Sequence, residues 1–319
     1  HATVTLADYR IRQGAYHQDP DLARAHAAHP FICMWDDHES ADNSYKDGAE
    51  NHDPRTQGSW TARKHASTQA YFEWMPVRPT SLAGGQHLYR RFRFGTLTEL
   101  IIPDLRSYRD KQSSARVDDP TQSITGAEQY TWLETSVTTS STRWQVIGSE
   151  VMMVPLTIPE STDPRLADWL HEKIGLPQDG IPVNNDQWDG YAAERRKLLS
   201  AIDAAGKKNV VLVAGDIHSS WASELPLNVS HYGSDRSGRT VACEFTVPSI
   251  TAASPHDTIA VNRALEAPTT ALLSAGREAI RLTNPWIKDV ELTSHGFGVM
   301  TVTAARAEME WFYVDDVLD

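Results

Sequence analysis

The sequence predicts a layered α/β protein, and three observations support this fold class. Its first half alternates short apolar runs with capped helical segments, whereas the later runs are mostly of strand length. Two apolar runs, at residues 31–34 and 210–213, are each followed by a cluster of Asp and His. The chain has 319 residues, of which 40% are hydrophobic, so it can bury a sizeable core.

Local signals justify the elements of the first half. Pro20 after Asp19 marks a helix start, and Ser59 can cap a helix that stops before Pro76. The polar residues 40–58 predict a long loop, and loops of that length are usually functional. We expect helices from residues 6 and 20, a strand at 30–35, a helix at 59–74, strands at 87–94 and 98–104, and a helix at 128–137.

The second half is richer in expected strands. Residues 144–154 predict a strand or a bent pair, and residues 156–186, rich in Pro, Asp, Asn and Gly, predict an excursion loop. A helix from Trp188 to Ala205 is ended by Gly206. The remaining expected elements are strands at 209–214, 221–227 and 240–246, helical stretches near 257–282, and a strand pair near 297–313.

Composition excludes two classes of protein. The formal net charge of −12 disfavours nucleic acid as a structural partner, because phosphate backbones attract Lys and Arg. No run approaches the roughly 20 apolar residues that span a bilayer, so no transmembrane segment is expected. Cys33 and Cys243 are expected as buried free thiols, with a disulfide as the alternative. The chain begins with His1 and shows no signal peptide, which indicates a processed chain or a fragment.

The first polar cluster is Asp36-Asp37-His38-Glu39. In extended backbone, neighbouring side chains point to opposite sides, so only one of the two aspartates is expected to face a given metal. A His beside a metal-bound carboxylate can contact a phosphate oxygen or protonate a leaving group. The alternative interpretation is a solvated acidic turn.

The second cluster is Gly215-Asp216-Ile217-His218. On an extended segment, Asp216 and His218 would point to the same side, where a carboxylate and an imidazole suit a transition metal. The alternative is an Asp–His hydrogen bond at a strand end. Ser219 and Ser220 do not lie in a Gly-x-Ser-x-Gly pattern, so no serine nucleophile is expected. Together the two clusters predict one metal-assisted hydrolytic site.

Several segments, in this order along nearly the whole chain, resemble the PhoD-type alkaline phosphatases, a branch of the calcineurin-like metallophosphatases. The segments are Val4–Arg10 (VTLADYR), Trp35–Glu39 (WDDHE), Gly48–His52 (GAENH), Glu73–Arg78 (EWMPVR), Asp104–Arg109 (DLRSYR), Trp188–Tyr191 (WDGY), Gly215–Trp221 (GDIHSSW) and the closing His295–Gly298 (HGFG).

The resemblance implies a four-layer α/β/β/α sandwich with one ferric ion and calcium ions. It implies that Asp37, Asp216 and His218 bind metal and that His38 contacts substrate and assists the leaving group. Asn51 is a candidate for a further calcium-side ligand, with a loop-stabilising role as the alternative.

A phosphate oxygen could be oriented by Arg106 or Arg109. The alternative for each arginine is a structural ion pair with Asp104 or Asp110.

This sequence departs from the family pattern in one respect. In the family, the first half of the catalytic domain precedes the Leu-Ala-Asp-Tyr-Arg segment and supplies iron ligands, and these residues contain no counterpart of it. Residues 1–319 are therefore expected to be the C-terminal portion of a single metallophosphatase domain. The sandwich would be incomplete without an N-terminal segment of the same parent protein, possibly a separate chain. The resemblance also implies a secreted or periplasmic location.

The expected activity is hydrolysis of phosphate esters, monoesters or diesters, by a metal-bound hydroxide. One alternative is a phospholipase D-like phosphodiesterase acting on lipid head groups. It would need an apolar rim, for which residues 156–186 and 231–238 look too polar. A non-catalytic binding module is the other alternative, but the ligand-type residues Asp37, His38, Asp216 and His218 are all present.

Overall fold

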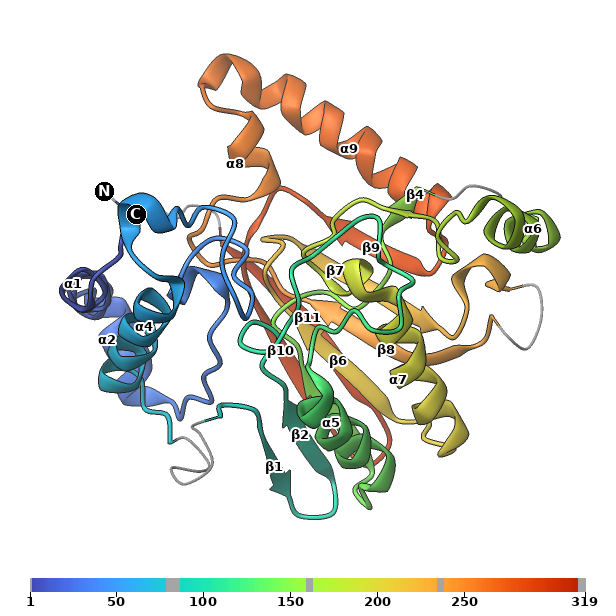
Figure 1. Ribbon diagram of the computed structural model, residues 1–319, viewed down its shortest axis with the longest axis horizontal. Coiled ribbons are helices and arrows are strands. Elements are labelled where there is room, and N and C mark those ends of the chain that lie inside the picture. The colour runs from blue at the N-terminus through green and yellow to red at the C-terminus, as the bar shows by residue number, and fades with distance from the viewer. Residues whose placement is uncertain (1, 79–86, 159–162, 234–237, 315–319) are drawn as a thin grey trace. The chain divides into compact units, whose positions relative to one another are not determined.

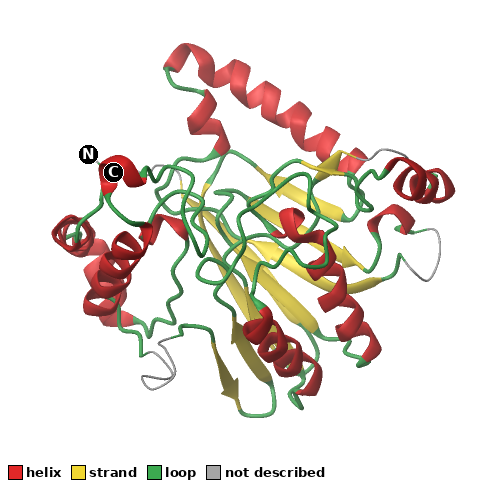
Figure 2. Cartoon of the chain, viewed as in Figure 1, coloured by secondary structure: helices red, strands yellow, loops and turns green. Residues whose placement is uncertain are grey.

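The structure is a computed structural model that describes residues 2–78, 87–158, 163–233 and 238–314. The chain divides into two compact units, which are described separately here. The first unit is His1–Arg90 with Asp104–Lys111, and the second is Arg91–Pro103 with Gln112–Asp319. Figure 2 shows helices in the first unit and both strands and helices in the second.

Helices with side-chain caps build the first unit. The Thr5, Asp19 and Ser59 side chains each accept a backbone N–H at the start of α1, α2 and α4, and of these caps the sequence analysis predicted that of Ser59. Helix α1 packs against α4, and Arg10 pairs with Glu73 across the two helices. The elements are α1 (Leu6–His17), α2 (Pro20–Ala28), η1 (Asp37–Glu39), α3 (Pro54–Gln57) and α4 (Trp60–Trp74).

The strand expected at residues 30–35 is not present, and that prediction is wrong. These residues have no regular secondary structure, and Phe31 and Ile32 are exposed. An apolar run becomes a strand only when a neighbouring strand takes up its backbone hydrogen bonds, and no described strand pairs with this run.

A seven-stranded mixed sheet forms the centre of the second unit, and it confirms the α/β class. The strand order is β1-β2-β3-β6-β8-β7-β9. Strands β2, β3, β6 and β8 pair in parallel, whereas β7 is antiparallel to both β8 and β9. The strands are β1 (Arg90–Phe94), which begins in the first unit, β2 (Thr98–Ile102), β3 (Trp144–Gly148), β6 (Val210–Ala214), β7 (Ser220–Pro226), β8 (Thr240–Thr246) and β9 (Ile287–Glu291).

Both faces of the sheet are covered, as Figure 1 shows. Helices α5 (Ala127–Thr139) and α7 (Ala192–Ala204) lie on one face, and the ribbon β10 (His295–Val302) with β11 (Ala307–Val314) lies on the other. The alternation along β8 matches these layers, because Phe245 packs against Trp311 of β11 while Glu244 faces away from the ribbon. Helices α8 (Pro255–Ile259) and α9 (Glu266–Thr283) confirm the helical stretch expected before β9.

The expected excursion loop at residues 156–186 contains regular structure that the sequence analysis missed. It includes β4 (Thr157–Ile158), α6 (Pro164–Ile174) and β5 (Ile181–Pro182). Residues 144–154 form β3 followed by an irregular segment rather than one long strand. Cys33 and Cys243 are free thiols, as expected, although both are only half-buried. Among the described residues, no helix has the length and apolar character needed to cross a membrane.

Candidate functional site

The first candidate cluster lies in a tight turn of the first unit. The Glu39 carboxylate accepts the backbone N–H of Asp36 at 2.6 Å, which closes the turn around η1. Asp37 is buried, and its two oxygens accept the backbone N–H groups of His38 and Asn43, each at 2.7 Å. Two backbone donors fix the orientation of this carboxylate, as they would for a metal ligand.

Asp36 and Asp37 do not diverge as the sequence analysis expected. One oxygen of each carboxylate lies within 4.8 Å of the other, because the chain turns into η1 instead of continuing in extended backbone. The prediction that only one of them could face a given metal is therefore wrong. Their protein partners still differ, since Asp36 pairs with the Arg106 guanidinium.

The contacts of Arg106 support its structural alternative, but with a different partner. Its side chain is only 3% exposed, and its Nε donates to Asp36. Its backbone N–H donates to Asp104 Oδ1 at 3.1 Å, while Asp110 pairs with Lys46. Arg106 therefore holds the Asp36 carboxylate in place within the first unit.

A cavity of about 20 Å³ lies behind this turn, large enough for about one water molecule. Trp35, Glu39, Tyr71 and Arg106 are among its lining residues. Burial raises the pKa of Glu39 to about 7, despite the backbone hydrogen bond that Glu39 accepts from Asp36. Glu39 can therefore exchange a proton near neutral pH.

His38 is exposed at the front of the turn. Its Nε2 lies 4.0 Å from Asp37 Oδ1 and 3.9 Å from Asp42 Oδ1, and the ligand-type atoms of the three side chains lie within 4.8 Å of one another. Sequence reasoning missed Asp42, because only the folding of the 40–43 turn brings it beside His38. Asn51 is exposed in a later turn, where Asn43 Nδ2 bonds Glu50 at 2.6 Å.

The second cluster lies in the turn between β6 and β7 of the second unit. Asp216 and His218 have φ values of +70° and +53°, so both adopt left-handed backbone. The expectation of an extended segment with both side chains on one side is wrong. The chain must reverse direction here, because β6 is parallel and β7 antiparallel to β8. Strained non-glycine backbone of this kind is concentrated at functional sites.

The tautomer of His218 follows from its contact with the backbone. Its Nδ1 lies 2.8 Å from the carbonyl oxygen of Ala253. A carbonyl can only accept, so Nδ1 carries the proton and Nε2 keeps a free lone pair. A metal-binding His has this arrangement, with one nitrogen fixed by a hydrogen bond and the other available.

Asp216 is tied to a buried segment of the same unit. The Gln187 side-chain amide donates to Asp216 Oδ2 at 3.3 Å, and Gln187 is only 1% exposed. The backbone N–H of Gly215 donates to the carbonyl of Glu150, also at 3.3 Å. These contacts connect the turn to the segments that follow β3 and precede α7.

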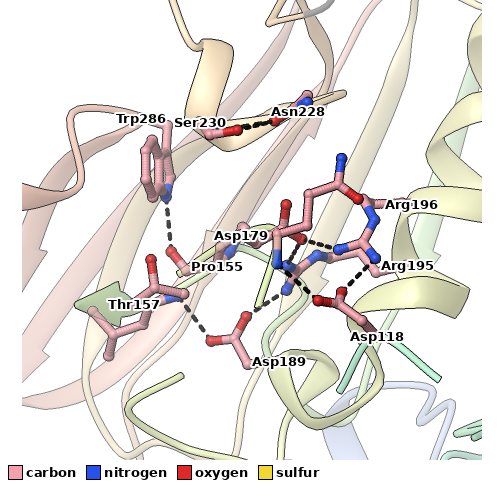
Figure 3. Close-up of polar contacts among 12 residues, drawn as sticks. Asp118, Pro155, Thr157, Asp179, Asp189, Arg195, Arg196, Asn228, Ser230 and Trp286 are labelled. Atoms are coloured by element: carbon pink, nitrogen blue, oxygen red, sulfur yellow. Dashed lines mark hydrogen bonds and ion pairs between the residues drawn. The ribbon is translucent and has the colours of Figure 1, made fainter. Parts of the chain in front are cut away.

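A buried ion network fixes the segment that carries Gln187 (Figure 3). Arg195 pairs with Asp189 and Asp179, and Arg196 pairs with Asp179 and Asp118. Asp189 follows Gln187 by two residues in the 3₁₀ helix η2 (Trp188–Tyr191). Burial raises the pKa of Asp189 to about 6, while the adjacent Arg195 opposes this change.

Gly190 completes this turn, because a Cβ there would lie 2.1 Å from the carbonyl oxygen of Asn185. The backbone at η2 therefore tolerates only glycine without a shift. Packing and ion pairing thus account for these residue types in the Trp-Asp-Gly-Tyr segment. The segment also holds the adjacent Gln187, which donates to Asp216.

The side chains of both clusters offer donor atoms of the kinds that bind metal ions. Carboxylate oxygens are the ligands that calcium prefers, and imidazole together with carboxylate binds iron. In the first unit these donors are Asp37, His38 and Asp42. In the second unit they are Asp216 and the free Nε2 of His218.

Comparison with known proteins finds a family, a relative and a solved structure that resemble this chain. The family model described as PhoD-like phosphatase matches residues 1–311. The chain is 32% identical over 258 residues to alkaline phosphatase D of Bacillus subtilis (strain 168), covering 78% of this chain and 40% of that protein. A solved structure described as "Structure of PhoD" matches with a TM-score of 0.72 and 26% identity, covering 97% of this chain and 56% of that one.

The chain thus spans about half the length, or less, of the relatives that it matches. The match to the family model nevertheless extends over almost all of its own residues. This chain belongs to the PhoD-like phosphatase family.

Proposed function

We propose that this chain carries a metal-dependent site for the hydrolysis of phosphate esters. The observation that carries the proposal is the geometry of His218, whose Nδ1 proton is held by a backbone carbonyl so that Nε2 is free to bind metal. The strained turn also presents Asp216 two residues earlier, at the carboxyl end of β6. Membership of the PhoD-like phosphatase family supports phosphate esters as the substrate class.

The residues with proposed roles are assigned separately for each of the two units. In the first unit Asp37 and Asn51 are metal ligands, and in the second Asp216 and His218 are. Ferric iron and calcium are the proposed ions; when bound, they would make a water more acidic and offset charge on phosphate oxygens. Attack by water breaks the ester P–O bond directly, without a phosphorylated side chain.

His38 is the proposed proton donor to the leaving oxygen. Its imidazole is exposed, and the carboxylates of Asp37 and Asp42 lie within 4.0 Å of Nε2. Arg106 was a candidate for a phosphate contact. Because it is buried and bonded to Asp36, we propose that it acts by holding that carboxylate.

The test replaces the two ligand candidates of the second unit. We expect Asp216→Asn and His218→Ala to lose bound metal. Their activity should fall by more than roughly 10–100-fold, which is the typical loss when only a residue that hydrogen-bonds to a metal ligand is replaced. Turnover of p-nitrophenyl phosphate and bis-p-nitrophenyl phosphate, metal content and circular dichroism would be measured together. Ser220→Ala, at the start of β7, is the control and should keep both metal and turnover. Near wild-type turnover in both ligand variants would contradict the assignment.

A second candidate function is a phosphodiesterase acting on lipid head groups. The expectation that residues 156–186 are too polar for a lipid-facing surface is wrong for the described residues of this segment. They expose the apolar side chains Ile158, Leu166, Trp169, Ile174, Ile181 and Val183. Phosphatidylcholine vesicles and the soluble ester glycerophosphocholine would be compared as substrates; preference for the vesicles, lost in Trp169→Ser, favours this candidate.

We also propose that additional polypeptide from the same parent protein, an N-terminal segment, works with these 319 residues outside the cytoplasm. The small number of candidate ligands in this chain supports the proposal, because one calcium ion alone takes six to eight oxygen ligands. The ribbon β10–β11 supports it too. Phe297, Val299, Phe312 and Val314 alternate along its two strands and are exposed. The added segment would complete the four-layer sandwich and supply further ligands.

A further inference from the structure

We propose that Asp257 and His295 are positioning residues that orient His218 through the peptide group between Ala253 and Ser254. The inference rests on the proposed function, in which His218 is a metal ligand. It gives a role to the closing His-Gly-aromatic segment, which the proposed roles leave unused. All the residues involved belong to the second unit.

The central element is a single peptide group with a partner at each end. Its carbonyl oxygen, on Ala253, accepts the Nδ1 proton of His218 at 2.8 Å. Its N–H, on Ser254, donates to Asp257 Oδ2 at 2.7 Å. Because a trans peptide is planar, with its N–H and C=O pointing in opposite directions, fixing one end fixes the other. Asp257 therefore sets the direction of the carbonyl that holds His218.

Asp257 is itself held by His295. Three donors converge on the same carboxylate oxygen: the backbone N–H of Ser254 at 2.7 Å, the Ser254 hydroxyl at 2.8 Å and His295 Nε2 at 2.8 Å. His295 lies at the start of β10, and its side chain is only 11% exposed. The pair thus anchors the segment 249–257 to the ribbon.

Backbone contacts hold the rest of this segment to the sheet and the ribbon. The Val247 N–H donates to the carbonyl of Ala214, at the end of β6, and the Gly296 N–H donates to the carbonyl of Ser249. Gly296 has φ +156°, and a Cβ there would lie 2.0 Å from the carbonyl oxygen of Phe312. The position beside His295 therefore requires glycine, which keeps the imidazole close to Asp257.

The consequence for His218 is a fixed tautomer. An oriented carbonyl stabilises the proton on Nδ1, and a hydrogen-bond chain that starts at a carboxylate strengthens this acceptor. In the neutral ring, Nε2 is then the nitrogen without a proton and points in one direction, as a metal ligand needs. Without Asp257 the peptide can rotate, and without His295 the Asp257 carboxylate is held by Ser254 alone, so in both cases the preference of the ring for Nδ1–H weakens.

The experiment reads the tautomer directly in metal-free protein. Long-range ¹H–¹⁵N spectra of the full protein with ¹⁵N-labelled histidine give the protonation of each ring nitrogen, and His218→Ala assigns the signal. We expect Nδ1–H in the wild type and a mixture with Nε2–H in both Asp257→Ala and His295→Ala. His295→Ala leaves the Ser254–Asp257 contacts at the start of α8 in place, so it separates the proposed effect from loss of the helix cap.

Binding of Co²⁺ to the chelator-stripped protein, followed by calorimetry, is the second readout. Both variants should bind Co²⁺ about 10–100-fold more weakly, and neither should have a further effect in the His218→Ala background. Asp168→Ala is the matched control, because it breaks the His231–Asp168 pair elsewhere in the second unit and should change neither readout.

Two outcomes separate this inference from the proposed function. An unchanged Nδ1–H tautomer in both variants would overturn the inference even if His218 binds Co²⁺. A tautomer that changes as expected, together with Co²⁺ affinity that does not depend on His218, would support the positioning role and overturn the ligand assignment.

Discussion

Asp36 and Asp37 are sequence neighbours whose carboxylates have different partners in the first unit. Asp37 accepts two backbone N–H groups, whereas Asp36 accepts the guanidinium of the buried Arg106. We therefore predict different losses from their replacement. Asp37→Ala should lose metal and activity, while Asp36→Ala should mainly lower the free energy of unfolding, by about 1–3 kcal/mol, because it breaks a pair to a buried charge.

Metal content, turnover and urea unfolding of the two variants would check this prediction. Asp42→Ala, on the other side of His38, serves as a comparison for the loss of one exposed carboxylate. If Asp36→Ala lost the metal and Asp37→Ala kept it, the assignment of Asp37 as the ligand would be reversed.

At this scale the sequence suggested candidate residues for the chemistry but not how they are arranged. Asp37, His38, Asp216 and His218 became candidates because Asp and His follow apolar runs. Their backbone was assigned wrongly, because a 3₁₀ turn and two left-handed residues leave no periodic signal. The Asp257 contact with His295 spans 38 residues and depends on how two distant segments fold, so no local pattern could reveal it.

Among the elements, the sheet was predicted best where strands are buried on both faces. Strand β6 is a continuous apolar run, as expected for a parallel strand inside an α/β layer. Helix α6 was missed because it lies in a segment rich in proline, aspartate and glycine, although Asp163 caps it and Pro164 begins it. The run at 30–35 was assigned wrongly because apolar content was taken for a strand without a known pairing partner.

Strand β8 also contains a titrating group whose effect on stability can be predicted. Glu244 is fully buried and accepts the backbone N–H groups of Met153 and Val154. Burial raises its pKa to about 7, above the ordinary value that it has in the unfolded chain. Between about pH 4.5 and 7 the folded state therefore keeps a proton that the unfolded state has released, and the free energy of unfolding falls as pH rises.

The variant Glu244→Gln cannot titrate and isolates this effect. From pH 4.5 to pH 8 the stability of the wild type relative to the variant should fall, by up to about 3 kcal/mol. Urea unfolding at both pH values, with equal m-values, measures the difference. The Asp189 titration is present in both proteins and largely cancels. A difference that stays constant with pH would show that Glu244 keeps an ordinary pKa in the fold.

On the scale of the whole molecule, each unit has its own ion pairs and capped elements, and each contains candidate ligands. The family was predicted from motifs in their order along the chain, and the α/β class from the alternation of apolar runs with capped helical segments. The division into two units was not predicted, because the sequence analysis expected residues 1–319 to be part of a single domain.

The exposed apolar face of the ribbon β10–β11 allows a test of the proposed N-terminal partner segment. Phe297 and Phe312 stack at 5.5 Å on the exposed face of the ribbon β10–β11, and such an apolar face favours association in water. We expect residues 1–319 expressed alone to aggregate or to lack activity, and co-expression with the N-terminal segment of the parent protein to give soluble, metal-loaded enzyme.

Phe297→Thr with Phe312→Thr provides the control for this experiment. The double variant should reduce aggregation of residues 1–319 without restoring activity, because it removes the apolar face but supplies no ligands. Analytical ultracentrifugation and metal analysis would follow both preparations. A monomeric, fully active product from residues 1–319 alone would show that this chain completes its site without a partner, and would overturn the need for further ligands.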